Sequence, residues 1–172
     1  MSEAHAARIE RMRRSYREAH ARLEARLRNA PQELVERTPD DGGWSAAQIG
    51  WHVATVDRLF AELVSGARVS QPLPDEFRER TWPEVVAGIP AKLEASAGSV
   101  PPAEVTRDEA LTALAASAKK LESALEGLAQ DRASRFGVTH KAVGTVTLAQ
   151  IGDWATAHTI RHNAQAKRVL GI

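Results

Sequence analysis

The sequence contains no cysteine. This absence excludes disulfide bonds, thiolate metal sites and a cysteine nucleophile, and it is compatible with a reducing cytosol. No run of apolar residues is long enough to cross a bilayer, and the first residues are polar rather than signal-like. We therefore expect a cytoplasmic protein that has no membrane partner.

An excess of charge of either sign is also missing. Lysine and arginine number 23 and aspartate and glutamate 22, so the formal net charge of +1 favours neither nucleic acid nor an anionic membrane. Arginines are dense in the first 28 residues, but glutamates are interleaved with them, which is more typical of a solvated helix face than of a nucleic-acid surface. With 43% hydrophobic residues, residues 1–172 are expected to form a single domain with one core.

Apolar residues recur at three- and four-residue steps, while no segment alternates at period two over the length of a strand. The main helices are expected over about 4–29, 46–65, 106–128 and 148–170. A weaker helix opens at Trp82-Pro83 and is interrupted by Gly88 and Pro90, whereas 67–80 and 130–146 are expected to be loops. This pattern predicts an all-α fold, a four-helix bundle with a short extra helix in the long connection.

Two of the expected helices begin in the same way. Ser45 with Gln48, and Thr147 with Gln150, have the residue types and spacing of a capping box, in which two side chains satisfy backbone groups at the helix start. Both starts share the letters Ala-Gln-Ile-Gly, at 47–50 and 149–152. This similarity predicts that the N-terminal ends of both helices are strongly fixed.

Histidines follow these two starts on the apolar stripes. His158 and His162 are one turn apart, so their Cβ atoms are expected about 5–6 Å apart on one face of the last helix. His52 lies on the stripe of the second helix. An unpaired buried polar group costs roughly 1–3 kcal/mol, and one divalent cation would satisfy all three rings. We therefore predict that the three imidazoles converge on a metal site.

A simpler interpretation stands beside this one. A single H-x-x-x-H pair or a single core histidine is more often hydrogen-bonded than metal-bound, but three on two inward stripes, in a chain with six histidines, favour a metal. His20 lies beside the stripe of the first helix and is a weaker candidate for an outer role. His5 and His140 are expected to be exposed to solvent.

Three neutral histidines leave at least one coordination position open, whereas structural zinc sites are normally closed by four protein ligands. An ion held in this way would lower the pKa of a bound water or bind a thiol as thiolate. Because the chain has no cysteine, such a thiol must come from a cosubstrate. Imidazole ligands suit zinc, nickel, copper and iron alike, so the pattern leaves the metal open.

Two blocks of sequence carry a wider likeness. They are Trp44-Ser-Ala-Ala-Gln-Ile-Gly-Trp-His52 followed by Asp57, and Gly144-Thr-Val-Thr-Leu148 leading to His158-Thr-Ile-Arg-His162-Asn-Ala-Gln165. In order, spacing and helix context these blocks resemble the DinB/YfiT-like superfamily of metalloenzymes. One departure is visible: many members have an acidic residue directly after the first histidine of the pair, where this chain has Thr159.

The resemblance implies an up-down-down-up bundle that is often a homodimer. It also implies a divalent metal, zinc or nickel first and manganese or iron as alternatives, held by His52, His158 and His162. Some members are thiol-dependent transferases or isomerases that use bacillithiol, mycothiol or glutathione. The DNA-damage association in the family's name concerns induction rather than DNA binding, so no nucleic-acid partner is implied.

Two functions of different classes remain open. The first is a metal-dependent enzyme, such as a low-molecular-weight-thiol S-transferase or a hydrolase, that acts on a small molecule. The second is a non-catalytic, stress-linked bundle that binds a metal or ligand. Outer-shell or substrate candidates are Asp57, Gln165 and His20, then Trp51, Trp154, Arg161 and loop 67–80. The simpler alternatives are packing for the two tryptophans, a surface charge for Arg161 and a solvated or capping carboxylate for Asp57.

Overall fold

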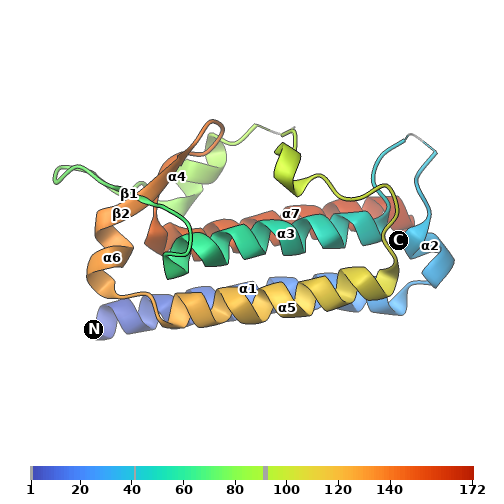
Figure 1. The fold of residues 1–172 in the computed structure, drawn as a ribbon, viewed down its shortest axis with the longest axis horizontal. Helices are drawn as coiled ribbons and strands as arrows, with labels where there is room; N and C mark the ends of the chain where they lie inside the picture. The colour runs from blue at the N-terminus through green and yellow to red at the C-terminus, as the bar shows by residue number, and fades with distance from the viewer. Residues whose placement is uncertain (1, 41, 91–92) are drawn as a thin grey trace.

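A computed structural model describes residues 2–40, 42–90 and 93–172. The long helices are α1 (Glu3–Asn29), α3 (Ala46–Ser65), α5 (Arg107–Glu126) and α7 (Ile151–Leu170). Figure 1 shows that α3 and α5 run in one direction and α1 and α7 in the other, so the predicted up-down-down-up helical bundle is confirmed. None of the helices in the described segments combines the length and apolarity that a membrane span needs.

Short elements decorate this bundle. They are α2 (Gln32–Glu36), α4 (Trp82–Ala87), α6 (Gln130–Arg135) and the 3-10 turns η1 (Ala97–Ser99) and η2 (Leu148–Gln150). The connection from α3 to α5 carries α4 and η1 and passes along the length of the bundle (Figure 1). The extra helix expected at Trp82 is therefore present, and it ends before Gly88.

Residues 130–146 were expected to be a loop, and no strand was expected anywhere; both predictions are wrong. Strands β1 (Gln71–Pro72), β2 (Phe136–His140) and β3 (Gly144–Thr147) form an antiparallel sheet in the order β1-β2-β3. In its β2–β3 hairpin, Val138 lies opposite Val146. These strands are too short to show a period of two in the sequence, and they are stabilised by pairing with one another and by packing on the core.

The two predicted capping boxes are present, and their glutamines have a second task. Gln48 accepts a hydrogen bond from the Ser45 N–H at 2.8 Å, and its side-chain amide donates to the Pro102 carbonyl at 2.8 Å. Gln150 closes the box with Thr147 and donates to the Arg80 carbonyl at 2.7 Å. The two glutamines therefore attach the long connection to the starts of α3 and α7.

The glycine of each Ala-Gln-Ile-Gly block marks a close approach between helices. A Cβ added at Gly50 would lie 2.7 Å from Leu27 Cδ1, and one added at Gly152 would lie 3.2 Å from Met12 Cβ. Both neighbours belong to α1. The repeated four residues thus serve two purposes in each helix, since glutamine fixes its start and glycine lets α1 pack against it.

A polar layer divides the buried core into two apolar clusters. One cluster includes Ile9 and Leu125, and the other includes Leu27 and Leu114. Between them every long helix contributes buried polar residues: His20 from α1, Thr55 and Asp57 from α3, Ser117 from α5 and Thr159 from α7. The candidate site lies at this level of the bundle, where the helices do not meet through apolar contacts alone.

Replacement of Ser45 by alanine is expected to lower the free energy of unfolding by about 1–2 kcal/mol, because the Gln48 N–H loses its acceptor. Urea denaturation measures the change. Ser65→Ala, at the exposed end of the same helix, is the matched control and should change stability by less than about 0.5 kcal/mol. Equal effects of the two substitutions would contradict the role of the cap.

Candidate metal centre

Three histidine rings from two helices meet at one point. His52 of α3 and His158 and His162 of α7 each offer a ring nitrogen, and the three nitrogens lie within 4.8 Å of one another. The ring centroids are 4.4 Å apart for His158 and His162, 4.7 Å for His52 and His162, and 5.2 Å for His52 and His158. The convergence predicted from the helix stripes is therefore what the fold produces.

The two α7 histidines lie at the edge of the core rather than at its centre. The fully buried face of α7 runs through Ile151, Ala155, Thr159 and Ala166, while His158 and His162 are half-buried beside it. The predicted stripe was thus displaced by one residue at this point. Thr159 hydrogen-bonds the Ala155 carbonyl at 2.9 Å, so its hydroxyl serves its own helix.

Two of the rings have an oxygen acceptor on one nitrogen. His52 Nδ1 donates to the Ser99 carbonyl of η1 at 2.7 Å, and His162 Nδ1 donates to Gln165 Oε1 at 2.8 Å. An oxygen that only accepts requires the proton on Nδ1, so the lone pair of each neutral ring is on Nε2. This arrangement of a ring N–H held from outside is the usual second layer of a metal-binding histidine.

The third ring is less completely satisfied. His158 Nδ1 is buried, and no hydrogen-bond partner for it exists among the described residues. The ring of Phe60 lies 6.5 Å from the ring of His158 in an edge arrangement, and it offers no hydrogen-bonding group. A buried nitrogen without a partner is a cost that a bound cation or an ordered water would remove.

Burial keeps the rings neutral. It lowers the pKa of His52 and lowers that of His158 well below the ordinary value, and it lowers the pKa of His162 to about 4. The neighbouring imidazoles and Arg161 act in the same direction on His158, whereas the Gln165 hydrogen bond opposes burial at His162. All three rings are therefore unprotonated near pH 7, which is the form that binds metal.

The donor set fits a divalent ion. Two nitrogens bound to one ion at about 2.1 Å are at most about 4.2 Å apart, so small ring rotations would bring the present nitrogens into range. Within the described segments the group contains no fourth histidine, aspartate or glutamate. Three neutral imidazoles that no further histidine or carboxylate joins among these residues make an open site, which suits zinc, nickel or iron.

The remaining candidates divide into two sets. Gln165 contacts the triad through His162, and Arg161 affects the pKa of two rings while donating to the Pro90 carbonyl at 3.3 Å. Trp51 and Trp154 are partly buried against the two apolar clusters, as expected for packing residues. The 67–80 segment contributes β1 to the sheet, and none of its carboxylates joins the triad.

Asp57 is not a solvated or capping carboxylate; that prediction is wrong. It is fully buried, and Tyr16 donates to its Oδ2 at 2.7 Å. His20 Nε2 lies 3.7 Å from the same oxygen, and His20 Nδ1 lies 3.1 Å from Glu24 Oε1. Burial raises the pKa of Asp57 to about 7, against the opposing hydrogen bond from Tyr16.

Two predictions of exposure also fail. His5 is buried, and its Nε2 is hydrogen-bonded to the Leu128 carbonyl at 2.8 Å. His140 is half-buried, with its ring 5.4 Å from that of Trp154. Ser99 could not be found from the sequence, since its contribution is a main-chain carbonyl in a connection that lacks any periodic signal.

These features define a helical bundle with an open histidine triad. The family model of the DinB superfamily matches residues 15–166, and the chain belongs to this superfamily. A crystal structure of a conserved protein from Enterococcus faecalis has the same fold, with a TM-score of 0.62 and 19% identity over 94% of each chain. A search among curated proteins finds no significant match.

Asp57→Asn is expected to stabilise the protein at pH 8 by up to about 4 kcal/mol. Because the pKa of Asp57 is raised from 3.8 to about 7, the folded chain binds more protons than the unfolded chain across this range, and stability is lost as pH rises through it. Asparagine cannot ionise, so the variant does not lose stability as the pH rises. Urea denaturation at pH 5 and pH 8 measures the difference, with exposed Asp75→Asn as control; a variant less stable than the parent at pH 8 would contradict it.

Gln165→Leu is expected to weaken zinc binding by about 10- to 100-fold, because His162 Nδ1–H loses its acceptor. Gln165→Glu keeps an acceptor oxygen at this position and should bind zinc at least as tightly as the parent. Competition with a chromophoric chelator measures both affinities. Unchanged affinity in the leucine variant would show that this hydrogen bond does not orient the ring for metal.

Proposed function

We propose that this protein binds one divalent metal ion through His52, His158 and His162 and uses it as an enzyme on a small-molecule substrate. The observation that carries the proposal is a group of three converging, neutral imidazoles that no fourth histidine or carboxylate joins within the described residues. Zinc or nickel is the proposed ion, with manganese or iron as alternatives. An open site favours chemistry, since purely structural sites are normally closed by protein ligands.

The proposed reaction class is S-transfer from a low-molecular-weight thiol to an electrophile. The thiol sulfur forms a bond to an electrophilic carbon, the bond from that carbon to its leaving group breaks, and the thiol proton leaves with that group or to solvent. When bound, the ion supplies Lewis-acid chemistry that stabilises a thiolate at neutral pH. The resemblance to thiol-dependent members of the superfamily supports this class, as does a chain that brings no cysteine of its own.

The chain's own residues have separate tasks in this proposal. The three rings hold the ion through unprotonated nitrogens, and Ser99 and Gln165 fix the orientation of two of them. Phe60 and Trp154, whose rings are 4.9 Å apart, give the triad an apolar neighbour that limits access of water. Apolar surroundings strengthen the electrostatic effect of an ion on whatever binds beside it.

His158→Ala is expected to abolish stoichiometric metal, whereas the parent should contain about one ion per chain. Elemental analysis of protein purified without added chelator measures the content. His140→Ala is the matched control, because it removes a half-buried imidazole that does not belong to the triad, and it should keep its metal. Full metal content in the His158 variant would overturn the site.

An assay with several low-molecular-weight thiols and an alkyl halide that yields a fluorescent thioether tests the reaction. Metal-dependent turnover in the parent and none in His158→Ala would support S-transfer. Stoichiometric metal without turnover by any thiol would contradict S-transfer and favour a non-catalytic metal-binding bundle.

A further inference from the structure

A row of aromatic rings leads from the triad to the β2–β3 hairpin. Phe60 lies 6.5 Å from His158, Trp154 lies 4.9 Å from Phe60, and His140 lies 5.4 Å from Trp154, all between ring centroids. Trp154 precedes His158 by four residues, so both lie on one face of α7. The row therefore forms a wall that has the triad at one end and His140 at the other, in which Phe60 is buried and Trp154 and His140 are partly exposed.

His140 ends this wall with a hydrogen-bond donor that is not in use. The Ala142 N–H donates to His140 Nδ1 at 3.2 Å, so in the neutral ring the proton is on Nε2. Among the described residues no group accepts a hydrogen bond from this Nε2–H, although the ring is half-buried. Partial burial, and then the charge of Lys141, lower the pKa of His140, which keeps the ring in this neutral form near pH 7.

The hairpin that carries His140 is held in place from several directions. Arg80 donates to the Val143 carbonyl at 2.7 Å, and the hydroxyls of Thr139 and Thr145 lie 2.8 Å apart across the hairpin. Gln71 of β1 donates to Thr139 at 2.7 Å. The position of the donor relative to the wall is therefore set before any ligand binds.

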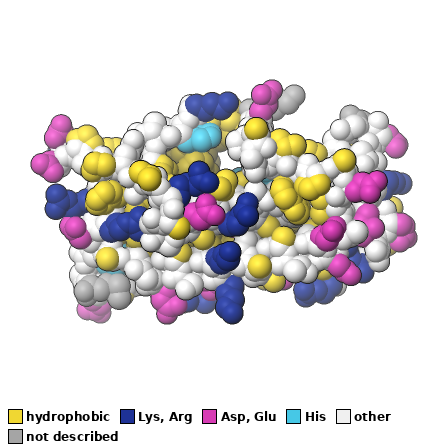
Figure 2. All heavy atoms as spheres, viewed as in Figure 1, with side chains coloured by type: hydrophobic (Ala, Val, Ile, Leu, Met, Phe, Trp, Pro, Cys, Tyr) yellow, Lys and Arg dark blue, Asp and Glu magenta, His cyan; other side chains and the backbone are white. Residues whose placement is uncertain are grey.

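Cations act on the histidines at both ends of the row. The charged side chains that act on the pKa of His158, His162 and His140 are Arg161 and Lys141, and no carboxylate acts on any of them. Lys141 is exposed at the turn of the hairpin, directly after His140. On this face Figure 2 shows a hollow with hydrophobic walls and a histidine side chain at its edge.

The geometry points to a binding subsite for a small carboxylate with an apolar or aromatic body, whose carboxylate accepts a hydrogen bond from His140 Nε2 and whose body rests on Trp154, a partly exposed ring of the row. The inference rests on the proposed function and deepens it, because such a ligand extends from the triad and would be the molecule on which the protein acts. His140 is then a specificity-determining residue, and the metal ion is held without it.

The test uses the full-length protein after treatment with a chelator, because a carboxylate can also bind a metal ion directly. The probes are 3-phenylpropionate and 2-phenylethylammonium, which share a phenylethyl skeleton and differ in the sign of their charge. Tryptophan fluorescence measures the dissociation constants. The parent should bind the carboxylate saturably and more tightly than the ammonium, and circular dichroism verifies that each variant is folded.

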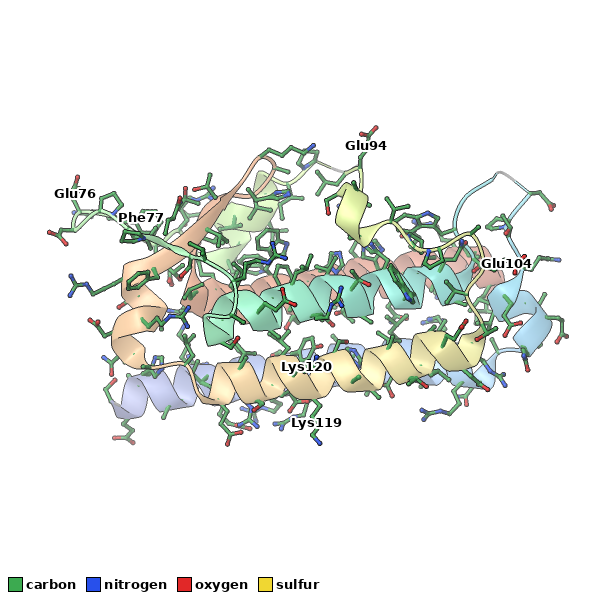
Figure 3. All side chains as sticks on the ribbon, viewed as in Figure 1. Glu76, Phe77, Glu94, Glu104, Lys119 and Lys120 are labelled. Atoms are coloured by element: carbon green, nitrogen blue, oxygen red, sulfur yellow. The ribbon has the colours of Figure 1, made fainter. Side chains whose placement is uncertain are left out.

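Loss of the His140 donor should weaken the binding of the carboxylate probe and leave the binding of the ammonium probe unchanged. His140→Ala is expected to raise the dissociation constant of 3-phenylpropionate about tenfold, whereas His140→Gln, which keeps an N–H donor, should stay within about threefold of the parent. Lys141→Gln should weaken binding about twofold. Lys119→Gln is its charge-matched control, since Figure 3 shows Lys119 on α5, on the side of the bundle away from the hairpin.

An unchanged dissociation constant in His140→Ala, equal binding of the two probes, or no saturable binding by the parent would each overturn the inference. These outcomes are independent of the metal. If the protein takes up no metal but discriminates between the probes through His140, the metal chemistry is refuted and the subsite is supported. If the protein takes up metal but does not discriminate between the probes, the metal centre is supported and the subsite is refuted.

Discussion

Three imidazole rings that pack together at the edge of the core lose much of their hydration, and this loss lowers the pKa of each of them. Among the described residues no carboxylate opposes this effect at His158 or His162, and Arg161 and the neighbouring rings add to it. Neutral rings keep free lone pairs, so the same burial that is costly for an isolated histidine prepares the group for a cation. The metal-binding proposal depends on this constraint more than on any single contact.

The long connection between α3 and α5 takes part in that preparation. It supplies the Ser99 carbonyl that fixes the His52 tautomer, and it is attached to the helix starts by Gln48 and Gln150. Asp57, at the polar level that separates the two apolar clusters, acts in a different place, since its contacts are with Tyr16 and His20 of α1. The bundle therefore holds two polar groups at the same level along its axis. Asp57 and its partners lie between the helices, and the histidine triad lies beneath the long connection.

Helices, caps and the convergence of the histidines could be predicted because each has a local signature: a period of 3.6, a capping box, an i,i+4 pair. The β2–β3 hairpin could not, since strands of five and four residues show no clear alternation. The burial of His5 and Asp57 could not be predicted, because their partners, the Leu128 carbonyl and Tyr16, are remote in sequence. The α7 stripe is displaced because the small residues Ala155 and Thr159, both fully buried, occupy the core face of the helix.

A crystal structure of the metal-loaded protein, with anomalous scattering recorded at the absorption edge of the bound ion, tests the central claim most directly. The account predicts one strong peak about 2.0–2.2 Å from a ring nitrogen of His52, His158 and His162, with a non-protein ligand completing the coordination. The His52 and His162 rings should keep their hydrogen bonds to Ser99 and Gln165. A peak elsewhere, or a fourth protein ligand that closes the site, would contradict it.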